Sequence, residues 1–273
     1  MRRPPAAVLV HAALIVGAAL TLTPLLWMVS ASFMPTGQAN SFPPPLLPSH
    51  ATLEHYRQLF VRLNLARAFA NSMVVSVIAT FGALIVTSLA GYAFAKLRFT
   101  GRDRVFHVLM MTMVVPSQVS MLPLFLLLRK MGLVNSLAGV VIPFLCPAFG
   151  IFMIRQFALS IPDELLDAAR IDGGSEWRIF REIVIPLLQP IIVTQALFTF
   201  LSSWNEFLWP LITLSDSHKW TLPVALANMV GEHVQDTELM MAGSVMTVLP
   251  VLIVFLALQR FYIRGVMMGS VKG

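Results

Sequence analysis

The sequence predicts an all-α membrane protein with six spanning helices, and three observations lead to this fold class. Charged residues make up 12% of the 273 residues, about half the share typical of a soluble domain. The mean hydropathy is +0.79. The apolar residues gather in blocks that reach the roughly 18 residues a spanning helix needs. Residues 1–273 are therefore expected to form one membrane domain.

Six apolar blocks mark the expected spans. They are Ala6–Ala31, Ser72–Ala95, Val105–Leu128, Leu133–Ile154, Pro186–Leu214 and Leu239–Leu258. Arg2 and Arg3 precede the first block as in a secretory signal, but that block exceeds the roughly 7 to 15 apolar residues of a signal core and is expected to be retained. Prolines inside several blocks predict kinked helices. Gly82 and Gly91 predict that another helix approaches the second span closely.

Basic residues predict the orientation and weigh against a nucleic-acid partner. If the N-terminus is cytoplasmic, thirteen of the nineteen Lys and Arg residues fall in inside segments and six in outside segments. Both termini are therefore expected in the cytoplasm. The net charge of +6 comes from short loops rather than from one basic face, so the lipid bilayer, and no nucleic acid, is the expected partner. The single Cys146 allows no intramolecular disulfide and no cysteine-based metal site.

Two longer segments, residues 33–70 and 215–238, are expected on the outer side. The first begins as a stiff, proline-rich connection, after which Thr52 is expected to cap a short helix. One face of this helix carries Leu53, Tyr56, Phe60 and Leu63. The helix is expected to lie as an interfacial anchor or against a partner. The second segment carries Asp216, Glu232, Asp236 and Glu238 against Lys219 alone.

Residues 160–186 form a polar segment in which two short helices are expected. Ser160 and, three positions later, the acid Asp163 are typical of a helix start with a hydroxyl cap. The first helix is expected to run to Ile171. The Gly173-Gly174 pair would stop it, because glycine supplies the left-handed residue that often follows a helix.

A second helix is expected from Ser175 toward Ile183. The spacing across both helices reads Asp167-Ala168-Ala169, three residues, Gly173, nine residues, Ile183, one residue, Ile185-Pro186. At these residues the sequence resembles the permease subunits of ATP-binding-cassette importers, whose signature loop reads Glu-Ala-Ala, three residues, Gly, nine residues, Ile, one residue, Leu-Pro. Asp167 and Ile185 are conservative departures from that pattern.

The resemblance extends over nearly the whole chain and is closest to the carbohydrate-uptake branch, in particular the smaller permease of the maltose type. It rests also on Gly91-Tyr92-Ala93, Trp204-Asn205-Glu206-Phe207 and the closing Gly269-Ser270-Val271-Lys272-Gly273. It implies the type I importer permease fold in a bacterial inner membrane, with residues 160–186 as a cytoplasmic coupling loop. It also implies a second homologous permease, two cytoplasmic ATPases and an extracytoplasmic binding protein, which the outer segment 215–238 would contact.

A transporter that converts ATPase closure into helix movement needs a rigid segment joined to its spans. The two predicted helices of the coupling loop meet this requirement. Ala168 and Ala169 give a helix face without bulk that seats in a groove of another protein. Acidic side chains beside them offer charges to basic groups of the partner. The docking candidates are Glu164, Asp167, Ala168, Ala169, Asp172, Gly173, Ile183 and Pro186. The alternative is a helical hairpin that has no partner.

No motif for covalent chemistry accompanies these features. The sequence contains no G-x-x-x-x-G-K-[ST] phosphate loop, no H-E-x-x-H and no cysteine pair. The chain is therefore expected to be no enzyme and to hold no metal or cofactor of its own. ATP and Mg²⁺ would be bound by the partner ATPases.

One acid, Glu206, falls inside an expected span, where ionisable groups are costly and often functional. The candidates for a polar translocation pathway are Gln195, Thr199, Ser202, Trp204, Asn205 and Glu206. Trp204 would offer its ring to a sugar face. In the alternative, Asn205 and Glu206 hydrogen-bond between helices near the outer interface. The resemblance implies that the other permease mainly holds the sugar.

These features favour a permease that moves a sugar or oligosaccharide inward by alternating access. A variant of this hypothesis is an importer for a polyol or glycerol phosphate compound. An ion-coupled secondary transporter would need several acids or histidines at membrane depth, where the sequence offers Glu206 and His107. A channel or scaffold without energy coupling would tolerate Asp167→Arg and Gly173→Pro.

Overall fold

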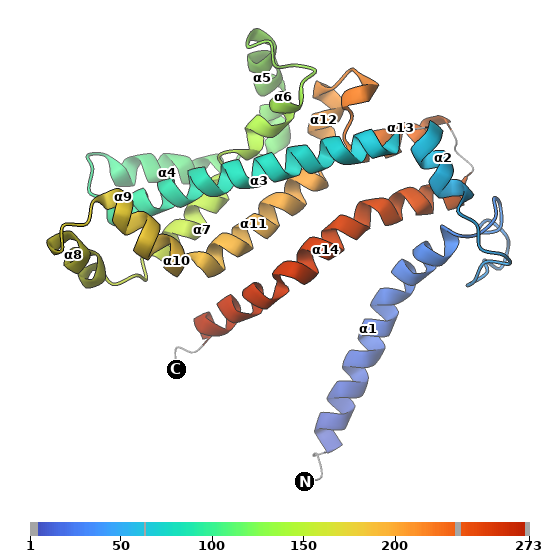
Figure 1. Cartoon of the computed structure of the whole chain (residues 1–273), viewed down its shortest axis with the longest axis horizontal. Helices are drawn as coiled ribbons and strands as arrows, with labels where there is room; N and C mark the ends of the chain where they lie inside the picture. Colours follow the sequence, from blue (N-terminus) through green and yellow to red (C-terminus); the bar gives the residue numbers. More distant parts are fainter. Residues whose placement is uncertain (1–4, 63, 233–235, 271–273) are drawn as a thin grey trace. The chain divides into compact units, whose positions relative to one another are not determined.

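The computed structural model describes residues 5–62, 64–232 and 236–270, and helices dominate these ranges (Figure 1). The first half of the chain forms α1 (Pro5–Ala31), α2 (Glu54–Arg62), α3 (Leu65–Lys96), α4 (Arg102–Thr112), α5 (Ser117–Lys130), α6 (Leu137–Val141), η1 (Ile142–Phe144) and α7 (Ala148–Ala158). The second half forms α8 (Asp163–Ile171), α9 (Glu176–Ile179), η2 (Phe180–Val184), α10 (Ile185–Leu187), α11 (Gln189–Trp204), α12 (Leu208–Thr213), η3 (Ser217–Lys219), α13 (Leu222–Glu232) and α14 (Thr237–Ser270). The predicted all-α class is confirmed.

Four stretches of helix are long and apolar enough to cross a membrane, and they correspond to the first, second, fourth and sixth expected spans. They are Leu9–Ala31, Leu65–Lys96, Leu137–Ala158 and Thr237–Gln259. Two further pairs of helices pass the same test together but are bent, and if each pair is one span the described part of the chain has six. Of the sequence signals discussed above, Arg2, Arg3, Leu63 and the last three residues of the closing motif lie outside the described residues.

The third expected span is not a continuous helix. It is broken between α4 and α5, whose axes differ by 104°. Pro116 precedes α5 with φ −59° and ψ 134°, and Pro116 also disfavours helical backbone at the residue before it. The chain therefore changes direction at the proline instead of kinking mildly within one helix.

The fifth expected span, Pro186–Leu214, is also divided. Its helix α11 ends at Trp204, and α12 is a separate short helix. At the other end the helical path starts earlier, in the coupling loop at Glu176, and bends by 77° before α11. Pro186 and Pro190 occupy first-turn positions of α10 and α11, where proline is tolerated because the missing N–H has no partner within the helix.

The chain divides into two compact units. One comprises Ala225–Pro250 and the chain up to Ala66; the other comprises Arg67–Val224 and the chain from Val251 on. In the second unit α3 lies against α7, as Gly91 predicted: a Cβ on Gly91 would be 2.5 Å from Cγ2 of Ile154. Contacts of α7 with α4 and α11 complete the packing around it (Figure 1).

In the first unit, α2 packs against the chain that follows α1. Thr52 Oγ1 accepts a hydrogen bond from the Glu54 N–H (3.1 Å), as predicted for the cap. The predicted apolar face is wrong, however, because Leu53 and Phe60 are exposed while His55 and Leu59 are fully buried. A polar contact contributes to the burial of this face as well as apolar packing, since the His55 ring nitrogen Nε2 lies 2.8 Å from the Met34 carbonyl oxygen.

The segment 215–238, which is expected on the outer side, contains the helix α13, and two of its acidic side chains make hydrogen bonds within the fold. Asp236 accepts from the Leu239 N–H (2.9 Å) at the start of α14. Glu238 is fully buried and accepts from the Ala39 N–H (2.6 Å). Asp236 therefore caps the start of α14, and Glu238 joins this helix start to the segment that follows α1. The side chain of Glu232 lies outside the described residues.

Candidate functional site

Residues 160–186, the expected coupling loop, fold into the two helices that the sequence predicts. Helix α8 covers Asp163–Ile171, and Gly173 follows it with φ +81°. Gly173 N–H donates to the Arg170 carbonyl (3.0 Å) and Gly174 N–H to the Ala169 carbonyl (2.9 Å). This pair of bonds is the glycine-dependent helix end known as the Schellman motif. The turn is therefore built by backbone hydrogen bonds that glycine permits.

The second helix begins where the sequence predicts, whereas the cap of the first is different. Ser175 Oγ accepts from the Arg178 N–H (3.3 Å) and caps α9. The predicted Ser160 cap is wrong: Pro162 occupies the cap position of α8. Ser160 Oγ donates instead to the Phe157 carbonyl (2.7 Å), because Ser160 still belongs to the turn that closes α7.

The docking candidates lie on the outer side of α8 and in a groove beside it. Glu164, Asp167 and Ala168 are exposed, while Leu166 points inward and is buried. Ala169, Asp172 and Ile183 line a groove of about 240 Å³ between the end of α8 and α9. Gly173 is exposed at the turn and Pro186 is exposed beyond it. Three of the eight candidates thus line the groove, and the other five are exposed on α8, at the turn or beyond it.

Two large apolar side chains on this surface were not predicted. Ile171 is 86% exposed at the end of α8, and Trp177 is 63% exposed at the start of α9. Aromatic side chains such as Trp are enriched at interface centres, and large exposed apolar side chains can mark an interaction site when they form a patch. The available sequence signal was their position beside the Gly173 turn, where a large apolar residue has no neighbouring helix to cover it.

Ion pairs order the charges of the loop. Arg170 donates to Asp167 Oδ1 (2.6 Å) and to Glu176 Oε1 (2.7 Å). These hydrogen bonds raise the pKa of Arg170, the Glu176 bond contributing most. The hydrogen bond and positive charge of Lys96 lower the pKa of the Asp163 carboxyl. Arg170 therefore holds the carboxylates of Asp167 and Glu176 in place and Lys96 holds that of Asp163, while Glu164 is exposed on α8.

The translocation candidates divide into buried and exposed residues. Gln195, Thr199 and Trp204 are buried. The Gln195 amide donates to Thr199 Oγ1 (3.1 Å), and the Trp204 ring stacks on Phe200 at a centroid distance of 5.8 Å. Ser202 and Asn205 are exposed at the end of α11.

Glu206 does not sit within a continuous spanning helix, contrary to the sequence-based expectation. It is half-buried in the break between α11 and α12, and its Oε1 accepts from the Trp209 N–H (3.1 Å). A carboxylate there satisfies an N–H at the start of α12 and lies at the favourable end of that helix's dipole. Asn205 likewise donates to the Leu201 carbonyl (2.9 Å) in its own helix. Neither bond joins two spans.

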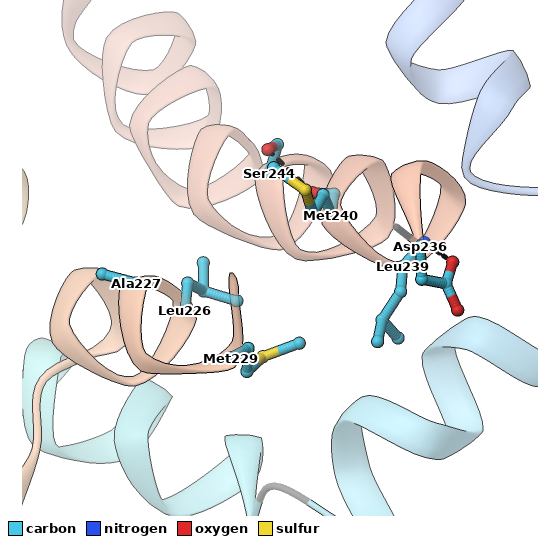
Figure 2. Close-up of a pocket in the computed structure, with 7 residues that line it drawn as sticks. All are labelled: Leu226, Ala227, Met229, Asp236, Leu239, Met240 and Ser244. Atoms are coloured by element: carbon cyan, nitrogen blue, oxygen red, sulfur yellow. Dashed lines mark hydrogen bonds between the residues drawn. The ribbon is translucent and has the colours of Figure 1, made fainter. Parts of the chain in front are cut away.

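A separate pocket of about 140 Å³ lies between α13 and α14 (Figure 2). Apolar side chains dominate its lining, and Asp236 at its edge is engaged by the Leu239 N–H. None of the six translocation candidates lines it. Within the part of the chain that the structure describes, no group of three or more His, Cys, Asp or Glu side chains is arranged to hold a metal ion.

Comparisons with known proteins agree on one kind of protein. Residues 83–267 match the family described as binding-protein-dependent transport system inner membrane component. The arabinooligosaccharides transport system permease protein of Halalkalibacterium halodurans is 38% identical over 92% of this chain and 91% of its own. The lactose transport system permease protein of Rhizobium radiobacter is 33% identical over 96% and 95%. A chain of a bacterial ABC transporter involved in the import of the acidic polysaccharide alginate superposes with a TM-score of 0.81, at 27% identity, over 96% of this chain and 99% of that one.

Proposed function

The chain belongs to the family of binding-protein-dependent transport system inner membrane components, and we propose that it is the permease subunit of an importer for an oligosaccharide. The substrate class is supported by relatives that carry arabinooligosaccharides and lactose and by a structural neighbour from an alginate importer. The family match includes residues of both compact units, which supports one permease domain over residues 1–273.

The observation that carries the mechanism is the two-helix coupling loop with its exposed outer face. Helix α8 exposes Glu164, Asp167 and Ala168, and a groove lined by Ala169, Asp172 and Ile183 lies at its end. A partner ATPase would seat α8 in a groove of its own and pair basic groups with the two carboxylates. The docking set proposed from the sequence is therefore retained, with Ile171 and Trp177 added as apolar anchors.

The partners follow from this role. Two ATPases would bind ATP and Mg²⁺, since the sequence contains no phosphate loop. A second, homologous permease would form the other half of the pathway, and an extracytoplasmic binding protein would deliver the sugar. ATP-driven closure of the ATPases would move the coupling loops and turn the cavity outward, and their opening would release the sugar inward. The chain itself would carry out no covalent step.

The proposed orientation places both termini and the coupling loop in the cytoplasm, because most Lys and Arg residues lie on that side. The proposed translocation surface lies where α11 ends. Ser202, Asn205 and Glu206 would meet the passing sugar, since they are exposed or half-buried. Gln195, Thr199 and Trp204 are buried and would hold this end of α11 in position.

The test is to purify the chain with its associated subunits in mild detergent and to measure ATP hydrolysis with the binding protein, with and without candidate oligosaccharides. We expect two ATPases to copurify and the loaded binding protein to stimulate hydrolysis over the unloaded one. A preparation that contains no ATPase, or vesicles that accumulate sugar from an ion gradient alone, would contradict the proposal.

A further inference from the structure

The last turns of α3 contact the beginning of the coupling loop. Lys96 Nζ donates to Asp163 Oδ1 (2.6 Å) and to the Ile161 carbonyl (2.6 Å). The Lys96 side chain is only 5% exposed although that of Asp163 is 75% exposed. The bond to the Ile161 carbonyl is therefore shielded from water and holds the chain two residues before α8 begins, while the bond to Asp163 holds the first residue of α8.

One turn earlier, the same helix contacts the start of α9, in the middle of the loop. Tyr92 donates its hydroxyl to Glu176 Oε2 (2.9 Å), and Glu176 Oε1 accepts from Arg170 (2.7 Å). Arg170 lies in the last turn of α8 and Glu176 is the first residue of α9. One carboxylate thus joins α3, α8 and α9. Hydrogen bonds to charged groups are stronger than neutral ones.

Apolar packing joins the same three elements. Tyr92, Leu166, Ile179 and Phe180 belong to one buried cluster, and the Tyr92 and Phe180 rings lie 5.4 Å apart. Tyr92 and Lys96 are four residues apart, so they project from the same face of α3. The end of α3 therefore holds α8 at both of its ends and packs on its inner side.

We propose that Tyr92 and Lys96 are positioning residues that make the coupling loop and α3 move as one body. This inference rests on the proposed function, because it concerns how movement imposed on the loop reaches a span. Packed interfaces transmit displacement when they have discrete, well-bonded arrangements. Without these bonds the loop still docks on the ATPase, through residues on its opposite face, but it rocks against α3, and ATP is hydrolysed without a matching movement of the span.

The test measures sugar transported per ATP hydrolysed, in vesicles that contain the complete transporter and its binding protein. Tyr92→Phe removes one hydroxyl, and Lys96→Met removes the ammonium while keeping the length of the side chain. Each is expected to lower the ratio by ~3- to 10-fold while the ATPases still copurify. Lys96→Arg should restore most of the ratio, and the matched control Lys130→Met, on an exposed residue of α5, should leave it unchanged.

Two outcomes overturn the inference. One is an unchanged ratio in the Tyr92→Phe, Lys96→Met double variant; the other is an equal loss in Lys130→Met. If Lys96→Met does not assemble, the exposed partner decides, because Asp163→Asn combined with Tyr92→Phe should lower the ratio while the shielded Lys96 side chain stays in place. An unchanged ratio there also contradicts the inference. Absence of copurifying ATPases from the wild-type preparation would instead contradict the proposed function.

Discussion

Replacing Gly173 by alanine should weaken coupling without a steric clash. Gly173 has φ +81°, and a Cβ built on it would meet no heavy atom within 4 Å. The cost is therefore conformational and amounts to ~1–2 kcal/mol for a residue other than glycine in the left-handed region. A cost of that size changes the equilibrium between the ordered and disordered turn by a factor of about 5 to 30.

The assay is binding-protein-stimulated ATP hydrolysis by the assembled transporter, together with hydrogen exchange of the α8 and α9 amides. Gly173→Ala should speed exchange in both helices and reduce stimulation, whereas Gly173→Asn should do so less, because asparagine tolerates left-handed backbone. Gly132 is the matched control, with φ +70° and no neighbour within 4 Å of a Cβ. Equal loss of stimulation in Gly132→Ala and Gly173→Ala would show that the left-handed turn at Gly173 has no special role in coupling.

Three further predictions concern the loop and its support. Asp167→Arg reverses a charge on the outer face of α8 and should abolish ATPase copurification, while Asp167→Glu should keep it; retention by the arginine variant would contradict docking at this residue. Gly91→Leu should lower the unfolding temperature, because its Cβ would lie 2.5 Å from a side-chain carbon of α7, an overpacking that costs ~1–3 kcal/mol; Gly17→Leu, with no neighbour within 4 Å, should not. Lys96 lowers the pKa of Asp163 below its usual 3.8, so the stability from this pair is present above that pH and is lost as the pH falls below it. The unfolding temperatures of wild type and Asp163→Asn should therefore differ at neutral pH and converge in acid, and a difference that persists in acid would exclude the ion pair as its cause.

Much of the coupling loop could be predicted because its signals are local. The turn requires left-handed backbone at Gly173, and the start of α9 requires an acceptor, which Ser175 provides. Both depend only on residues within a few positions of the turn. The spacing from Asp167 to Pro186 also indicated the family that the comparisons confirm. The prediction that Ser160 caps α8 was wrong because its hydroxyl lies between two helix ends. It donates to the Phe157 carbonyl at the end of α7 instead.

The broken spans could not be predicted from hydropathy. The mean hydropathy of a window around Pro116 or Asn205 depends on composition alone and not on the direction of the helix axis. A helix pair bent by 104° and a straight helix therefore give the same hydropathy. The buried face of α2 was missed for a different reason. The His55 ring is buried where the Met34 carbonyl oxygen can accept a hydrogen bond from Nε2, and no pattern within α2 itself specifies that partner.

The most direct test of the account asks whether the outer face of α8 contacts an ATPase. The sequence contains one cysteine, Cys146, so Cys146→Ser gives a cysteine-free background into which Ala168→Cys can be introduced. A short thiol-to-amine cross-linker should join residue 168 to the ATPase in the assembled complex, and Lys130→Cys in the same background should give no such product. Failure of residue 168 to cross-link, or equal cross-linking from residue 130, would contradict the assignment of the coupling loop.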